Sequence, residues 1–167
     1  MKYNRPYATA SYGTMATDWE GGVNYDRMRK ARLQRAQNAI KAAGLGGVIC
    51  FNFDNIRYVT GTHIGEWARD KFMRYTLCPT DGPPFLWDPA APAKRIAAPW
   101  IASHVAAPIS TMQGALRPGM KIDSAFAKQI KKALVEYGIE NKPIGIDIME
   151  LPMLRALEAE GIEVVDG

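Results

Sequence analysis

The stretch Phe51-Asn-Phe-Asp-Asn-Ile-Arg-Tyr-Val-Thr-Gly61 decides which fold is predicted for this chain. It continues an apolar run, Gly46-Gly-Val-Ile-Cys50. The residues from Val48 to Phe53 show no polar alternation, which predicts a strand buried on both faces. The Asn-Ile-Arg-Tyr-x-Thr-Gly residues that follow are predicted to form a turn. Upstream, apolar residues recur at helical spacing from about Asn24 to Ala43, so a helix should precede the strand.

Strands and helices alternate through the rest of the chain. Turn residues are dense over Pro79–Pro84, so the apolar runs Phe72–Cys78 and Phe85–Trp87 are predicted to form an antiparallel hairpin. The other expected elements are a helical stretch from Ala90 to about Val105, a short strand at Ile109–Met112, helices at Ser124–Tyr137 and Leu151–Ala159, and strands at Ile144–Ile148 and Ile162–Val165. This order predicts the α/β class. The hairpin makes the sheet mixed, with helices flanking it.

Length and composition exclude several classes of protein. The 167 residues suit one domain with a sizeable core. No apolar run approaches the roughly 18 residues of a membrane span, and Met1–Pro6 lack an apolar signal core. We therefore expect a cytoplasmic protein with no membrane partner. The two cysteines, Cys50 and Cys78, lie in apolar runs and are expected to be buried, reduced thiols.

The net charge of +4 comes largely from the first predicted helix. A basic helix can bind nucleic acid or another anionic partner, or it can be a solvated outer face. No aromatic side chains alternate with these cations to stack on bases. We therefore expect a solvated face and no nucleic-acid partner.

Catalytic motifs of the common hydrolases and nucleotide-binding enzymes are absent from the sequence. The two histidines, His63 and His104, are far apart, and neither has a second potential ligand at helical spacing. No metal or other cofactor is expected in this chain. Asp147 lies in a predicted buried strand and is expected to be a capping or structural group rather than a base.

A polar segment from His63 to Arg74 is the best candidate for a binding site. Arg74 could hold a carboxylate through two parallel hydrogen bonds, and Trp67 could cover an apolar or quaternary-ammonium group. The alternative is a surface loop whose Trp67 and Phe72 are buried at its ends.

The whole order of elements resembles the N-terminal domain of the creatinase/prolidase family, whose members carry a catalytic "pita-bread" domain downstream. The resemblance rests on the strand Gly47–Phe51, on Asn55-Ile-Arg-Tyr58 and Thr60-Gly61, on the hairpin, and on the closing helix Leu154–Gly161. It implies an N-terminal arm over residues 1–22 and one domain over residues 23–167, with the catalytic domain missing from this chain.

The resemblance also implies a function. In this family two divalent metal ions (manganese, cobalt or zinc) are bound by residues of the downstream domain, so no activity is expected from this chain alone. The N-terminal domain shapes a homodimer and closes over the active site. The first expectation for the parent enzyme is an Xaa-Pro dipeptidase or aminopeptidase acting on a small peptide. The alternatives are a creatinase-like or dimethylsulfoniopropionate lyase-like parent with an amino-acid-like substrate, or a free-standing small-molecule-binding module.

Candidate substrate-contacting residues follow from the same resemblance. Creatinase-like members touch substrate with a Phe and an Arg two positions later, a pattern matched here by Phe72 and Arg74, and the lyases line the pocket with a Trp at the place of Trp67. His63 belongs to the same segment. Met73 departs from creatinase, which has a smaller residue there. A pocket arginine is not a core residue, so replacing Arg74 should barely change stability.

Overall fold

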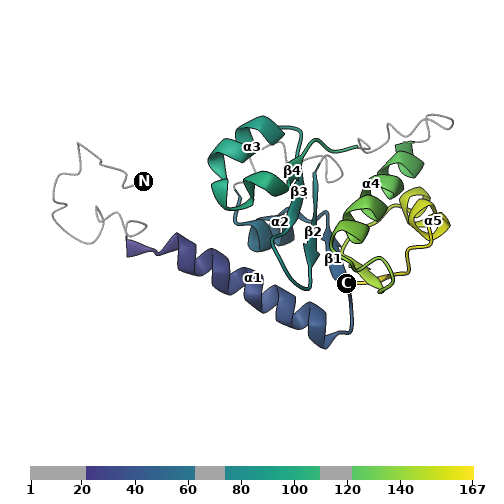
Figure 1. The fold of residues 1–167 in the computed structure, drawn as a ribbon, viewed down its shortest axis with the longest axis horizontal. Coiled ribbons are helices and arrows are strands. Elements are labelled where there is room, and N and C mark those ends of the chain that lie inside the picture. The colour runs from purple at the N-terminus through teal and green to yellow at the C-terminus, as the bar shows by residue number, and fades with distance from the viewer. Residues whose placement is uncertain (1–21, 63–73, 110–121) are drawn as a thin grey trace.

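A computed structural model describes residues 22–62, 74–109 and 122–167 (Figure 1). Its centre is a six-stranded sheet in the order β4-β3-β2-β1-β5-β6. The elements, in chain order, are α1 (Tyr25–Ala42), β1 (Gly47–Cys50), α2 (Phe53–Thr60), β2 (Tyr75–Pro79), β3 (Phe85–Trp87), α3 (Ala91–Ala97), the 3-10 helix η3 (Pro99–His104), β4 (Val105–Ala106), α4 (Ile122–Glu136), β5 (Ile144–Ile146), α5 (Leu151–Ala159) and β6 (Val164–Asp166). The predicted α/β class is confirmed.

The sheet is mixed, as the hairpin predicted. β2 and β3 pair antiparallel, and β1 lies antiparallel to β2 but parallel to β5. The outermost pair at each edge of the sheet is parallel: β5 with β6 at one edge and β3 with β4 at the other. The central strands are covered on both faces, which explains why their sequences are continuously apolar.

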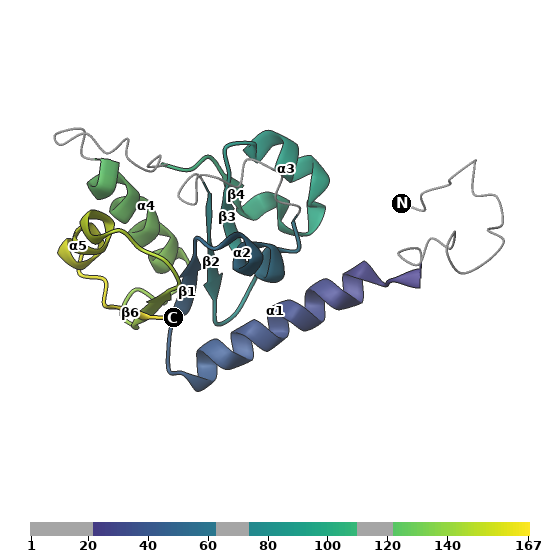
Figure 2. The ribbon, with the colours of Figure 1, turned by 180° about the vertical axis from the view of Figure 1, so that it is seen from behind.

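Alternate residues of β1 and β2 face two different layers of helices. Ile49 and Leu77 pack in the main core with α4 and α5. Their neighbours Cys50 and Cys78 face the opposite side, where α1, α2, α3 and η3 lie. Both views show α4 and α5 on one side of the sheet and α2 and α3 on the other, with the long α1 extending below (Figures 1 and 2).

The predicted turn after β1 is wrong: these residues form α2. The strand ends at Cys50, and the Asn52 side chain accepts a hydrogen bond from Asp54 N at 2.9 Å, which caps a helix beginning at Phe53. Asp54 lies in the positive first turn. Gly61 ends the helix with a φ of 65°, a left-handed conformation that glycine adopts readily. The Asn and Gly residues that suggested a turn are the two caps of a short helix.

Other boundaries shift by a few residues. β5 is shorter than predicted and ends at Ile146, while β6 runs from Val164 to Asp166. Ile109 is not in a strand, and the rest of the predicted strand Ile109–Met112 lies outside the described residues; the outer strand β4 is at Val105–Ala106. The arm predicted over residues 1–22 lies outside the described residues except for its last one.

α1 has few buried residues but firm local anchors. Asn24 caps it as predicted, accepting a hydrogen bond from Arg27 N at 2.9 Å. Gln37 is buried and donates from Nε2 to two carbonyls of the hairpin turn, Pro79 O at 3.2 Å and Gly82 O at 2.7 Å. This amide links the helix to the hairpin turn through two directional hydrogen bonds.

Candidate functional site

Arg74 is the only predicted site residue within the described part of the chain; His63, Trp67 and Phe72 fall outside it. The hairpin register places Arg74. Tyr75 pairs with Trp87, so the residue before β2 lies opposite the residue after β3, which is Asp88. Cross-strand neighbours of this kind are close enough to interact directly.

Arg74 and Asp88 form a buried ion pair. Arg74 Nε lies 3.2 Å from Asp88 Oδ2, and the two residues are 8% and 0% exposed. The other carboxylate oxygen, Oδ1, accepts a hydrogen bond from Ala90 N at 2.7 Å, at the start of α3. The Arg74 guanidinium carbon lies 5.4 Å from the centre of the Phe53 ring, at the start of α2. The pair therefore joins the hairpin to two helices on one face of the sheet.

The ion pair leaves donors unused. Among the described residues, neither Nε nor Nη1 of Arg74 makes a hydrogen bond of good geometry, and Asp88 Oδ2 accepts none. Lys94 of α3 lies close enough to interact electrostatically: burial lowers its pKa, Asp88 raises it and Arg74 lowers it. Arg74 is the group of this cluster that can donate to an anion, above all to a carboxylate.

The burial of Arg74 contradicts the expectation that its replacement would leave stability unchanged. Removing one partner of a buried ion pair strands the other charge in a poorly solvated place. Sequence reasoning also missed Asp88 and Lys94. The closeness of Asp88 to Arg74 could have been predicted from the sequence. Asp88 directly follows the second strand of the predicted hairpin, and in an antiparallel pair that position lies opposite the start of the first strand.

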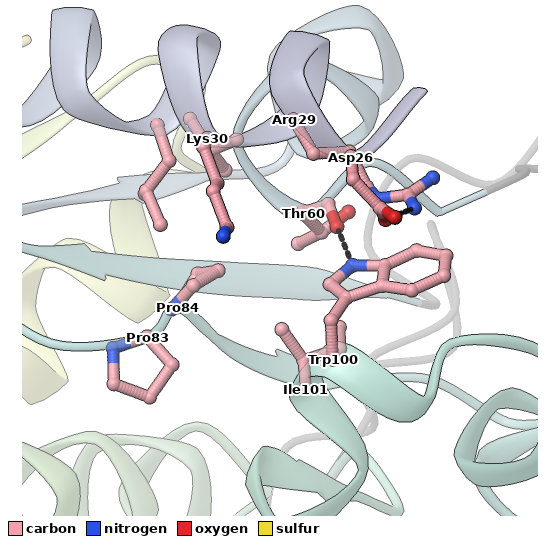
Figure 3. A pocket seen from close by; sticks show the side chains of 10 residues that line it. Asp26, Arg29, Lys30, Thr60, Pro83, Pro84, Trp100 and Ile101 are labelled. Atoms are coloured by element: carbon pink, nitrogen blue, oxygen red, sulfur yellow. Dashed lines mark hydrogen bonds and ion pairs between the residues drawn. The ribbon is translucent and has the colours of Figure 1, made fainter. Parts of the chain in front are cut away.

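A second feature is a hollow of about 200 Å³ beneath the first turns of α1 (Figure 3). Its floor and walls are mostly apolar, and its rim carries charged groups of α1. The lining residues are Asp26, Arg29, Lys30, Leu33, Val59, Thr60, Pro83, Pro84, Trp100 and Ile101. Arg29 lies over the Trp100 ring, with the guanidinium carbon 3.8 Å from the ring centre, and Trp100 Nε1 donates to Thr60 O at 2.7 Å. No signal in the sequence predicted this hollow.

Other polar groups of interest are structural. Asp147 accepts hydrogen bonds from Phe51 N at 2.7 Å, Asn52 N at 3.1 Å and Asn55 Nδ2 at 2.9 Å, so it ties β5 to the start of α2 as a structural group, in line with the prediction. Cys50 and Cys78 are free and buried. Burial raises the pKa of both thiols, that of Cys78 to about 12, which makes them poor nucleophiles.

The described residues contain neither a cluster of metal-ligating side chains nor a membrane-spanning helix. No group of three or more His, Cys, Asp or Glu side chains in residues 22–62, 74–109 and 122–167 is arranged to hold a metal ion. Within the same residues no helix has the length and apolar character needed to cross a bilayer.

Comparison with known proteins places this geometry in context. The family model of the Creatinase/Prolidase N-terminal domain matches residues 32–166. The dimethylsulfoniopropionate lyase DddP of Roseovarius nubinhibens is 30% identical over 165 residues, which cover 94% of this chain and 36% of that protein. The chain thus spans about a third of the length of this curated relative.

Solved structures show the same fold. The N-terminal domain of the cytoplasmic peptidase PepQ from Mycobacterium tuberculosis superposes with a TM-score of 0.54 at 20% identity, covering 82% of this chain and 92% of that domain. The Xaa-Pro dipeptidase of Bacillus anthracis gives a TM-score of 0.54 at 15% identity, covering 83% of this chain and 33% of that one. These identities are too low to indicate more than a shared fold.

Proposed function

The chain belongs to the creatinase/prolidase N-terminal domain family, and we propose that it acts as the non-catalytic domain of a longer, metal-dependent enzyme. In this role it contributes to a homodimer and covers the substrate pocket of a catalytic domain. The observation that carries the proposal is Arg74, a buried cation at the start of the hairpin whose Nε and Nη1 make no hydrogen bond with the described residues. Chemistry at the metal ions then falls to the catalytic domain, and this chain supplies binding and closure.

Arg74 is suited to hold a substrate carboxylate. Asp88 and the Phe53 ring restrict its guanidinium, so little side-chain entropy is lost when a ligand binds. Among the described residues the unused Nη1 offers the hydrogen bond that a carboxylate needs. Binding of this kind would orient an amino-acid-like substrate without any group of this chain taking part in the chemical step.

Two kinds of parent enzyme compete. The fold is shared with Xaa-Pro dipeptidases, whereas the 30% identical relative is a dimethylsulfoniopropionate lyase. Both kinds of substrate carry a carboxylate for Arg74. Dimethylsulfoniopropionate also carries a sulfonium cation, which an aromatic ring such as that of Trp67 would attract, as it would a quaternary ammonium group. The sequence relationship therefore favours a lyase-like parent over the peptidase that the fold alone suggests.

The parent's metal ions and location are parts of the same proposal. We place the two divalent ions, manganese, cobalt or zinc, in the catalytic domain, and the enzyme in the cytoplasm. The 167-residue chain purified alone should then hold no stoichiometric transition metal and cleave neither class of substrate. One tightly held equivalent of zinc, manganese or cobalt by elemental analysis would contradict this division of labour.

Assay of the longer enzyme decides between the parents. Dimethylsulfoniopropionate and a set of Xaa-Pro dipeptides should be tested at matched concentrations with each metal. Release of dimethyl sulfide without dipeptide cleavage supports the lyase-like parent. Proline release without dimethyl sulfide supports the peptidase. Absence of every metal-dependent activity, with substrate binding retained by the chain alone, would support a free-standing binding module.

A further inference from the structure

We propose that the hollow beneath α1 is a binding site for a small organic monoanion with an apolar body, such as a short branched or aromatic carboxylate. The hollow is separate from the Arg74 cluster. Phe53, which contacts Arg74, is the first residue of α2, whereas Thr60, which lines the hollow, is the last. At the rise of an α-helix their Cα atoms are about 10 Å apart along the axis. The proposal does not depend on the function of the parent enzyme.

The size and lining of the hollow define the body of the ligand. A dry, apolar cavity of about 150 Å³ can hold benzene, so about 200 Å³ is room for a ring or a branched chain of similar size. Leu33, Val59 and Ile101 supply aliphatic surface, and Pro83 and Pro84 of the hairpin turn supply more. Water in such a hollow finds few hydrogen-bond partners, which favours its displacement by an apolar group.

The aromatic wall is already held in place before any ligand binds. The Trp100 indole is fixed by its hydrogen bond to Thr60 O and is covered by Arg29. Arg29 is fixed in turn, because it pairs with Asp26 and its stem lies on Gly61, where a Cβ would come within 2.6 Å of the Arg29 Cγ and Cδ atoms. A rigid wall lowers the entropic cost of binding.

The charge of the ligand follows from the charges at the rim. Asp26 and Arg29 pair with each other, so their charges largely cancel. Lys30 is the remaining charged residue of the lining, and Figure 3 shows its side chain running from α1 toward the hollow beside Pro84. Among the described residues no ion pair of Lys30 is found, and one such ammonium group beside an apolar hollow favours one negative charge on a ligand.

An NMR titration of the full 167-residue chain tests the proposal. The probes are phenylacetate and its neutral counterpart phenylacetamide. The reporter is the indole Nε1–H signal of Trp100, one of four tryptophans, assigned as the indole signal lost in Trp100→Phe. Phenylacetate should shift this signal with a Kd of about 1 mM, a realistic value for a ligand of ten heavy atoms. Phenylacetamide should bind about three- to fivefold more weakly, since a partly exposed ion pair is worth little more than this.

Matched variants locate the charge and the body of the site. Lys30→Met should weaken phenylacetate to the level of the amide, while Lys41→Met, in the last turn of α1, should leave its affinity unchanged. Leu33→Trp should fill the hollow and abolish binding, with a melting curve to show that the chain still folds. The proposal is overturned if the Trp100 signal does not move up to about 20 mM probe, if acid and amide bind equally, or if Lys41→Met weakens binding as much as Lys30→Met.

Discussion

Arg74 and Asp88 have both a structural role and a proposed binding role. As a structural pair they hold the open end of the hairpin against α2 and α3. As a site they keep a cation in a place with little water, with donors that no described residue uses. Buried ion pairs seldom add net stability, because desolvation offsets their attraction. Two apolar residues could pack here without that desolvation cost, so we assign the ion pair to binding.

Single and double replacements of this pair should behave very differently. Arg74→Met or Asp88→Leu alone should lower the free energy of unfolding by about 3–5 kcal/mol, because each strands one buried charge. The double variant Arg74→Met/Asp88→Leu should come close to the original stability or exceed it. Urea unfolding of the chain followed by circular dichroism measures all three. Additive losses in the double variant would show that the two side chains do not act as a pair.

The thiols of Cys50 and Cys78 make stability depend on alkaline pH. Burial raises the pKa of Cys78 from 9.0 to about 12 and that of Cys50 in the same direction. Above pH 9 the unfolded chain loses these protons and the folded chain keeps them, so stability present below pH 9 is lost as the pH rises toward the folded values. The loss should be about 1.4 kcal/mol per thiol for each pH unit.

Unfolding measured from about pH 8 to about pH 10 tests this linkage against Cys50→Ala/Cys78→Ala. The comparison of slopes is needed because Lys94, whose pKa is lowered by burial, contributes with the opposite sign over part of this range. A smaller loss in the variant is expected. Equal slopes in the two proteins would mean that the thiols ionise alike in the folded and unfolded chains.

Among the elements, α2 depends most on a residue far away in the sequence. Its N-terminus is held by Asn52 and by Asp147, whose carboxylate accepts from two backbone N–H groups and the Asn55 amide. Local sequence did not reveal this arrangement. Asn52, Asn55 and Gly61 favour a turn as well as helix caps. The helix is selected by Asp147, which directly follows β5, about ninety residues later.

Asp147→Ala should therefore loosen the start of α2 more than the sheet. Loss of three hydrogen bonds to a half-buried carboxylate predicts a fall in the free energy of unfolding of about 2–4 kcal/mol. Hydrogen exchange should quicken first at Phe51 and Asn52, whose amides donate to Asp147. Asp147→Asn is the matched control and should recover part of the loss. Unchanged exchange at these two amides in Asp147→Ala would contradict the role given to this carboxylate.

At the scale of elements the sequence predicts most of the fold. The hairpin, the helix α4 and the cap of α1 follow from local signals: turn residues, an apolar stripe and Asn24. The candidate sites among the described residues could not be predicted in the same way. Arg74 could be named from its surroundings in the sequence, but its burial depends on β3 and α3, and the hollow beneath α1 depends on three separate segments. Contacts between distant segments leave no periodic trace in the chain.

The whole molecule exposes apolar side chains on opposite faces of its sheet. Ile96 of α3 is 84% exposed, and Trp100 of η3 is 40% exposed. On the other face Leu151 of α5 is 57% exposed. Large exposed apolar side chains of this kind mark candidate contact surfaces.

Self-association of the chain is expected, and Ile96 of α3 and Trp100 of the next element η3 are the candidate contact residues. Sedimentation velocity should show a concentration-dependent dimer. Ile96→Glu should weaken it by about tenfold, the cost of about 1.4 kcal/mol expected for a charge in an apolar contact. Leu151→Glu is the control and should leave it unchanged. A chain that stays monomeric at high concentration would remove support for the dimer.

The central claim, that this domain binds substrate for a catalytic domain through Arg74, is best tested by the steady-state kinetics of the longer enzyme carrying Arg74→Met/Asp88→Leu. This double variant removes the Arg74 charge without leaving the Asp88 carboxylate buried and unpaired. The variant should therefore stay folded, which a melting curve verifies, and a loss of activity then reports the loss of binding. Arg57→Met, at an exposed arginine of α2, is the control. Loss of a charge-assisted contact predicts that kcat/KM falls by about 30- to 1000-fold in the double variant. A folded double variant within about twofold of the original kcat/KM would contradict the claim.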